Sequence, residues 1–156
     1  METVNHECYV SLEVAKLLKE AGFDWECETC YMGKSKHAYK YNKYFNWNLP
    51  RKDFEKGGSD NLFYAFINQK KTNNFVSAHT LDVAQKWLRE VKNVWIEVLL
   101  VNATDPHYRV DLVNTSKYNN SYGIIHVADY KEYEVPEEAL EAGIKKALEM
   151  ILEKEE

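Results

Sequence analysis

The chain has 156 residues, of which 45% are hydrophobic and 13% aromatic, and its formal net charge at pH 7 is −5. This length and composition allow a substantial buried core, which excludes an intrinsically disordered protein. The negative charge argues against nucleic-acid binding by the whole surface. The longest apolar runs, such as VWIEVLLV, are far shorter than the roughly 20 residues of a membrane span. The amino terminus does not have the pattern of a signal peptide. We therefore expect a soluble cytoplasmic protein.

Two segments far apart in the chain have nearly the same sequence. SLEVAKLLKEAGFDWECE begins at Ser11, and TLDVAQKWLREVKNVWIEV begins at Thr80. Each of these hydroxyl residues is suited to cap a helix, because its oxygen can accept from the free N–H groups of the first turn. Apolar residues then recur at helical spacing, which predicts two amphipathic helices. They are Leu12, Val14, Ala15, Leu17, Leu18 and Ala21 in the first segment, and Val83, Ala84, Trp87, Leu88 and Val91 in the second.

Each predicted helix is followed closely by a tryptophan that opens a run with strand character. Gly22 is predicted to close the first helix in the left-handed conformation, with Phe23 folding back over the helix end. Trp25 follows the first helix and Trp95 follows the second. The repeated unit is therefore predicted to be a helix, a short turn and a strand that contains the tryptophan.

The second half of the chain continues with further strands and a final helix. HYRVDLV alternates apolar and polar residues in the two-residue period of a half-buried strand. Another strand is predicted from Ile124 onward. Pro136 is predicted to open a helix, with Glu137 and Glu138 in the first turn, where the helix dipole favours anions. The apolar residues of this helix are Leu140, Ile144, Ala147, Leu148 and Ile151.

The first half is predicted to follow the same order, with strands near residues 25–32, 39–47 and 62–67. We therefore predict an α+β fold in which an α-β-β-β unit occurs twice, in residues 1–78 and 79–156, and a C-terminal helix closes the second unit. The helices are expected to pack on antiparallel sheet, and the two halves are expected to form one compact domain.

Three strings of the sequence together resemble a family of short, uncharacterised proteins from the genomes of gut anaerobes and their phages or other mobile elements. These strings are SLEVAKLLKEAGFDW, TLDVAQKWLREV and YEVPEEALEAGIKKALEMI. The resemblance covers most of the chain except the middle loop, and it implies a mobile-element origin without a specific function. The predicted order α-β-β-β-α is also similar, in topology only, to the double-stranded-RNA-binding domain. Such domains carry a basic cluster where this chain has Glu137 and Glu138, so the sequence does not favour RNA-duplex binding by that route.

The string CETC makes zinc or thiol chemistry a candidate. Thiolates and imidazoles suit a tetrahedral zinc site, which Cys27 and Cys30 could form with Cys8 and with His6 or His37. The repeat instead places the CETC cysteines inside a strand, where they would point to opposite faces and lie roughly 10 Å apart. Three cysteines are also too few for a disulfide framework. We expect ordinary, partly buried thiols, and keep a small enzyme or a zinc-binding protein as the alternative.

The sequence contains no group of residues that forms a known catalytic motif. The histidines are scattered, no serine lies in a nucleophile-elbow context, and no glycine-rich phosphate loop is present. His126 and Asp129 could meet near a strand end, although a structural histidine is the more common case. We therefore expect a non-enzymatic protein without a cofactor.

Residues 31–52, which we call the lysine–tyrosine stretch, have the most unusual composition. They contain six lysine and arginine residues and no acidic residue, so the rest of the chain carries a net charge of −11. Aromatic residues alternate with the lysines, as in proteins that hold single-stranded nucleic acid by its phosphates and stacked bases. The same aromatic residues could instead form the buried face of a strand. The residues that we predict to bind a partner are Lys34, Lys36, Lys40, Tyr41, Lys43 and Tyr44.

The sequence as a whole thus predicts a small accessory protein of mobile-element type that binds a macromolecule. Either single-stranded nucleic acid or an acidic protein would suit the lysine–tyrosine stretch. We expect no membrane partner, and the sequence leaves homo-oligomerisation open.

Overall fold

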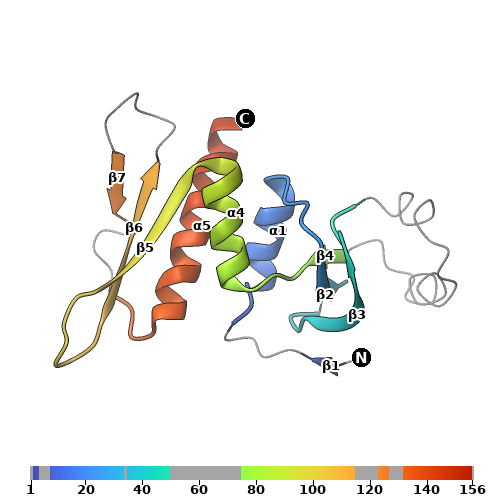
Figure 1. Ribbon diagram of the computed structural model, residues 1–156, viewed down its shortest axis with the longest axis horizontal. Helices are drawn as coiled ribbons and strands as arrows, with labels where there is room; N and C mark the ends of the chain where they lie inside the picture. Colours follow the sequence, from blue (N-terminus) through green and yellow to red (C-terminus); the bar gives the residue numbers. More distant parts are fainter. Residues whose placement is uncertain are drawn as a thin grey trace, which may run out of the picture.

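The computed structural model describes residues 2–3, 8–33, 35–49, 75–114, 123–126 and 132–155. Within these residues the chain forms three helices and antiparallel strands, so the predicted α+β class is confirmed (Figure 1). The helices are α1 (Leu12–Glu20), α4 (Leu81–Lys92) and α5 (Pro136–Glu155). The strands are β1 (Glu2–Thr3), β2 (Cys27–Met32), β3 (Tyr39–Phe45), β4 (Phe75–Ser77), β5 (Val94–Leu100), β6 (Tyr108–Asn114) and β7 (Gly123–His126). Among the described helices, none combines the length and the apolar character that crossing a bilayer requires.

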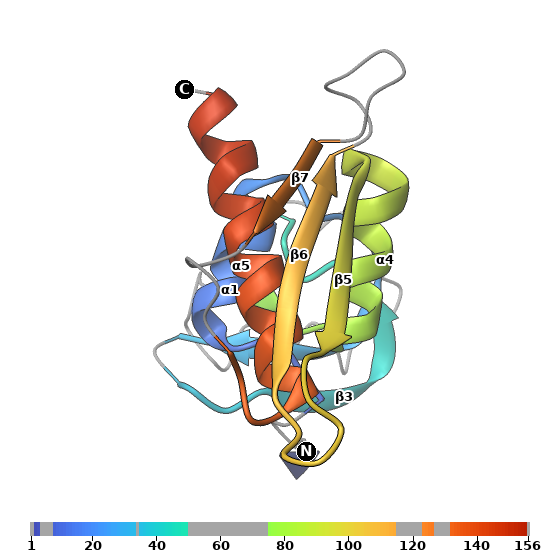
Figure 2. The ribbon, with the colours of Figure 1, turned by 90° about the vertical axis from the view of Figure 1, so that its left-hand side faces the viewer.

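The described strands form two antiparallel sheets that lie on either side of the helices (Figure 1). One sheet has the order β1-β3-β2-β4, and the other has the order β5-β6-β7. Helices α4 and α5 pack against the β5-β6-β7 sheet, as the view onto that sheet shows (Figure 2). Helix α1 contacts α5 and β4, so it joins the helical layer to the other sheet.

Helix α1 begins and ends as its sequence predicts. The Ser11 Oγ accepts a hydrogen bond of 3.3 Å from the backbone N–H of Val14, which caps the first turn. Gly22 adopts a φ of 92°, and the N–H of Phe23 donates to the carbonyl of Leu18 at 2.9 Å. This bond closes the helix in a Schellman motif, and it folds Phe23 into the core, where its side chain is only 2% exposed.

Helix α4 is also capped as predicted, but its buried stripe is shorter than expected. The Thr80 Oγ1 accepts from the N–H of Val83 at 3.3 Å, and Asn93 ends the helix in the left-handed conformation, with a φ of 57°. Trp87 and Leu88 are buried, whereas Val91 is 48% exposed, so the prediction of Val91 as a core residue is wrong. Helical spacing predicts burial only where a neighbouring element covers the side chain, and no described element does so at the last turn of α4.

The internal repeat is not confirmed beyond its two capped helices. Trp95 lies inside β5 as predicted, but Trp25 precedes β2 by two residues. Strand β2 lies between β3 and β4, whereas β5 is the edge of its sheet among the described strands. The two sheets therefore have different strand orders. The strand predicted near residues 62–67 lies outside the described residues.

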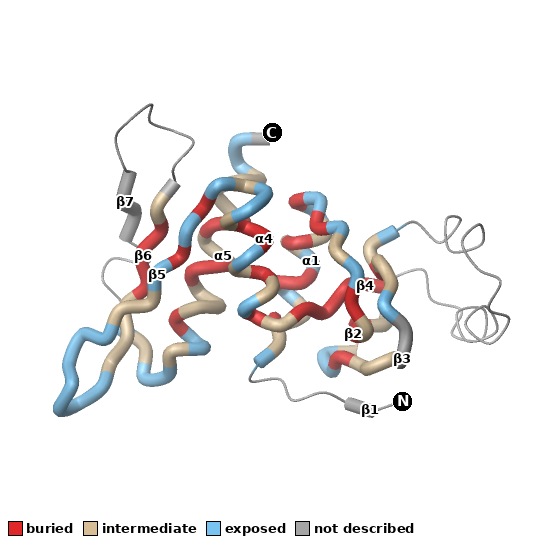
Figure 3. The backbone as a smooth tube through the Cα atoms, in the orientation of Figure 1, coloured by how far each residue is buried: buried red, intermediate tan, exposed pale blue. Residues whose placement is uncertain are grey.

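The buried residues form a large central cluster and a smaller one (Figure 3). The large cluster draws on all three described helices and on strands from both sheets, so residues 1–78 and 79–156 both contribute to it. The small cluster lies within the β1-β3-β2-β4 sheet and the turn after β3. Its buried members are Cys27, Cys30, Trp47 and Phe75. Tyr31 and Trp47 of the lysine–tyrosine stretch are thus buried.

Candidate functional site

The structure describes the side chains of two of the lysines that were predicted to bind a partner, and their surroundings differ. Lys36 is exposed in the turn between β2 and β3. The Lys40 Nζ lies 3.2 Å from the Glu28 Oε1 on the neighbouring strand, and both side chains are partly exposed. Lys34 and the side chain of Lys43 lie outside the described residues. Of the four predicted lysines, Lys36 is therefore the one that the structure describes without an ion pair to another described residue.

The aromatic residues of the stretch mostly pack inside the protein. Trp47 is fully buried, with the ring of Phe45 at 5.7 Å and the ring of Tyr41 at 6.1 Å, both in edge-on geometry. Tyr41 is partly buried, so its predicted role in binding competes with a packing role. Tyr44, by contrast, is 66% exposed. The alternative interpretation of a buried strand face therefore holds only in part: Tyr41 and Phe45 of β3 are partly buried, and Trp47 is buried in the turn after the strand.

The CETC cysteines lie in β2, as the sequence predicts, but they do not point to opposite sides of the sheet. Cys27 and Cys30 are both buried, and both belong to the small cluster. The ladder between β2 and β3 shifts its register between Cys27 and Thr29, which breaks the two-residue alternation. The expectation of opposite faces is therefore wrong. Burial raises the pKa of both thiols, which favours the neutral S–H form.

The other candidate metal or catalytic residues are not brought together in the described part of the chain. Cys8 and His37 are exposed, while His6 and Asp129 lie outside the described residues. The backbone of His126 pairs with Asp111 across the β6–β7 ladder, but its side chain is not described. Among the described residues there is no group of three metal-ligating side chains.

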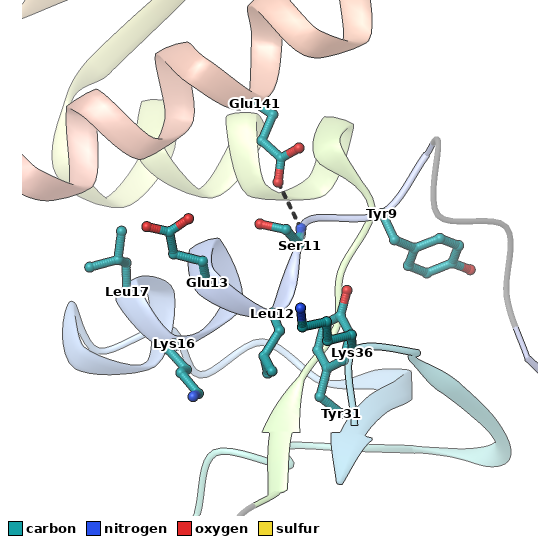
Figure 4. Close-up of a pocket in the computed structure, with 9 residues that line it drawn as sticks. All are labelled: Tyr9, Ser11, Leu12, Glu13, Lys16, Leu17, Tyr31, Lys36 and Glu141. Carbon is teal, nitrogen blue, oxygen red and sulfur yellow. Dashed lines mark hydrogen bonds between the residues drawn. The ribbon is translucent and has the colours of Figure 1, made fainter. Parts of the chain in front are cut away.

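A groove of about 660 Å³ lies between α1, α5 and the turn that follows β2 (Figure 4). The side chains of Leu12 and Leu17 from α1 form apolar lining, and Tyr31 of β2 contributes to the floor. Lys16 reaches the groove from α1, and Lys36 reaches it from the turn. The remaining lining residues are Tyr9, Ser11, Glu13 and Glu141. The groove thus joins two residues of the lysine–tyrosine stretch, Tyr31 and Lys36, to residues that are distant in sequence.

Both acidic side chains of the groove have contacts within the protein, but only Glu13 has an oppositely charged partner. The Glu141 Oε1 accepts a hydrogen bond of 2.7 Å from the backbone N–H of Ser11, at the start of α1. The Glu13 Oε1 lies 2.8 Å from the Lys145 Nζ, and this contact raises the pKa of Lys145. Lys16 and Lys36 make no ion pair with any residue that the structure describes. The hydrogen bond from Ser11 does not cancel the charge of Glu141, so Lys16, Lys36 and Glu141 together leave a small positive excess at the groove.

Tyr31 is a rigid part of the groove floor and not a reactive group. Its side chain is fully buried, and its hydroxyl donates a hydrogen bond to the carbonyl of Val10. Burial, with a smaller contribution from the charge of Glu141, raises the pKa of Tyr31 to about 12. The phenol therefore stays protonated near neutral pH and holds the segment before α1 against β2.

A smaller hollow of about 230 Å³ adjoins the groove at Tyr9, which lines both. It contains His79, whose ring packs edge-on against Phe23 at 4.4 Å. The His79 Nε2 lies 3.0 Å from the carbonyl oxygen of Trp25, so this nitrogen carries the proton and donates. Burial lowers the pKa of His79. The sequence did not predict these contacts of His79, because Phe23 and Trp25 lie in a distant segment of the chain.

Acid is expected to destabilise the protein through His79. The folded state holds this imidazole neutral, with a pKa below the ordinary value of 6.5, so its contribution to stability is present above pH 6.5 and is lost as the pH falls through the lowered pKa. Each pH unit between the two pKa values removes up to about 1.4 kcal/mol. Denaturant titrations of the wild type and of His79→Gln at descending pH measure this. If the free energy of unfolding falls with pH equally in the wild type and in His79→Gln, the assignment to His79 is contradicted.

A second exposed feature lies on the β5-β6-β7 sheet. Trp95 is 47% exposed, and the guanidinium of Arg89 lies over its ring at 5.3 Å. This cation–π contact gives Trp95 an intramolecular partner, whereas Lys16 and Lys36 make no ion pair with a described residue. We therefore regard the groove as the candidate site.

Comparison of the chain with protein-family models, with curated proteins and with solved structures finds no match to any of them.

Proposed function

We propose that the chain is a non-enzymatic accessory protein of mobile-element type that binds a macromolecular partner at the groove. The observation that carries this proposal is the presence of two uncompensated lysines, Lys16 and Lys36, beside apolar side chains in a hollow of about 660 Å³. A volume of this size lies within the range of ordinary ligand-binding pockets. The groove therefore has room for several side chains of a partner.

The charge distribution supports a binding role over a structural one. Surface ion pairs contribute little to stability, and Lys16 and Lys36 have none among the described residues. Two exposed cations that line one hollow without a described ion pair therefore contribute little to folding. They are suited to attract an anionic group from outside the protein.

The alternatives of an enzyme or a zinc protein are less favoured by the same geometry. Burial raises the pKa of Tyr31, Cys27 and Cys30, so none of these groups is activated as a nucleophile. The two thiols also pack in an apolar cluster with Trp47 and Phe75. A partner-binding role needs only the exposed lysines and the apolar lining.

Site-specific photo-crosslinking in the expressing cell tests the proposal. A photoreactive lysine analogue that keeps the side-chain ammonium, placed at position 36, is expected to give discrete adducts with a partner, because Lys36 lies at the groove. The same amino acid at position 154, an exposed site near the end of α5, serves as the control. The proposal is contradicted if position 36 gives no adducts beyond those seen at position 154.

A further inference from the structure

Resting on the proposed function, we infer that the groove binds an acidic peptide segment that carries an apolar side chain. A peptide of this kind presents carboxylates and an apolar group within a few residues of each other. The groove offers the two complementary features, cations and apolar lining, on adjacent elements. The arrangement of the cations and the apolar lining in the groove is the basis for inferring an acidic peptide as the partner.

The apolar part of the groove comes from the face of α1. Leu12 and Leu17 are only partly buried and pack against the edge of the central cluster, so part of each side chain is accessible. Tyr31 is held in place beneath them by its hydrogen bond to the carbonyl of Val10. The lining is therefore fixed before a partner binds, which lowers the entropic cost of association.

The cationic part of the groove is limited to a small area. Lys16 and Lys36 are the only lysines among the described residues that line it, and the acidic Glu13 and Glu141 line the same hollow. The N–H of Ser11, at the start of α1, is already occupied by Glu141. A ligand with one or two carboxylates can contact the lysines while it avoids the acidic side chains. A row of phosphates would also meet the negative charges of Glu13 and Glu141.

Single-stranded nucleic acid fits the described surface less well. Binding of that kind combines a basic track along the backbone with aromatic rings that stack on the bases. Here Lys40 is paired with Glu28, and Tyr41 packs against Trp47. The exposed ring of Tyr44 lines the neighbouring hollow together with Glu26 and Glu28, whose charges repel phosphate. The exposed ring of Tyr44 therefore lines one hollow, whereas Lys16 and Lys36 line the other.

Selection from a display library of short random peptides tests the inference. Peptides that bind the wild type are expected to be enriched in Asp and Glu next to Leu, Ile or Phe. A synthetic copy of an enriched peptide is expected to lose about tenfold or more in affinity for the Lys16→Glu, Lys36→Glu double variant, because each lysine contact becomes a repulsion. Its affinity for Leu17→Gln is also expected to fall, since Leu17 supplies apolar lining.

Matched controls distinguish the groove from general charge effects. The Lys146→Glu, Lys154→Glu double variant has the same change in net charge but alters lysines that do not line the groove, so it should bind like the wild type. Thermal melts of each variant check the fold.

Absence of enriched peptides, enrichment without acidic residues, or equal binding by both double variants would overturn the inference. If oligothymidylate binds more tightly than any peptide and Lys36→Glu abolishes this, the peptide inference fails while the proposed function stands. Absence of cross-links at position 36 would instead remove the proposed function.

Discussion

Replacing Trp47 with alanine is expected to lower the free energy of unfolding by about 3–5 kcal/mol, the usual range for truncating a buried tryptophan. The side chain is 0% exposed, and its ring lies 5.7 Å from Phe45 and 5.8 Å from Phe75. The Trp47 Nε1 donates a hydrogen bond of 2.9 Å to the carbonyl of Cys27. Truncation removes this bond and leaves a cavity in the small cluster.

Denaturant titration measures this loss, and Trp47→Phe separates its two causes. Phenylalanine keeps an aromatic ring in the cluster but removes the donor to Cys27, so we expect a smaller loss of about 1–3 kcal/mol. If Trp47→Ala costs no more than an ordinary surface change, Trp47 is not the centre of a packed cluster. The aromatic part of the lysine–tyrosine stretch would then be open for binding.

Replacing Gly143 with valine is expected to destabilise the protein by about 3 kcal/mol or more, which is the upper range for overpacking. A Cβ atom at this position of α5 would lie 2.6 Å from the Val110 Cγ2 and 2.8 Å from the Ile96 Cγ2. Both neighbours are buried β-branched residues of the sheet, so their methyl groups cannot easily move aside. The absence of a side chain at Gly143 therefore sets how closely α5 approaches β5 and β6.

Two further variants grade this effect. Gly143→Ala is also expected to destabilise, because the steric overlap outweighs the advantage of about 1 kcal/mol that alanine has over glycine in a helix. Ala142→Val, on the adjacent and partly exposed position, is expected to cost less than about 1 kcal/mol. Thermal and denaturant unfolding measure the stability of each variant and so rank the three substitutions. A Gly143→Ala variant more stable than the wild type would show that α5 does not approach the sheet this closely.

Local features of the fold could be predicted from the sequence because short-range rules govern them. Ser11 and Thr80 cap the predicted helices, Gly22 closes the first one, and Pro136 opens the last. The strand from Tyr108 also lies where the alternation of its residues predicts. Each of these features depends on hydrogen bonds or spacing within a few residues.

Features that depend on contacts between distant segments could not be predicted in the same way. Strand β2 takes its second neighbour from Phe75–Ser77, which no pattern in the sequence indicates. The shift of register near Cys27 overturned the expected alternation of the CETC cysteines. The similarity of α1 and α4 thus extends to their caps and apolar stripes, whereas the sheets that follow them depend on different partners.

The candidate site was predicted only in part for the same reason. Lys36 belongs to the stretch whose composition stood out, but Lys16 lies on an ordinary solvated helix face. Glu141 and Ser11, which are 130 residues apart, meet at one end of the groove. No local signal links these residues, so the groove is visible only once α1, α5 and the turn after β2 are brought together.

The most direct test of the groove as the binding site is an amide chemical-shift titration of the isotope-labelled protein. The ligand is the partner recovered by cross-linking or the selected acidic peptide. We expect the largest shifts at the residues that line the groove, which include Leu12, Glu13, Lys16, Leu17, Tyr31 and Lys36. Shifts concentrated instead around Trp95 on the β5-β6-β7 sheet, with those groove residues unchanged, would contradict the account.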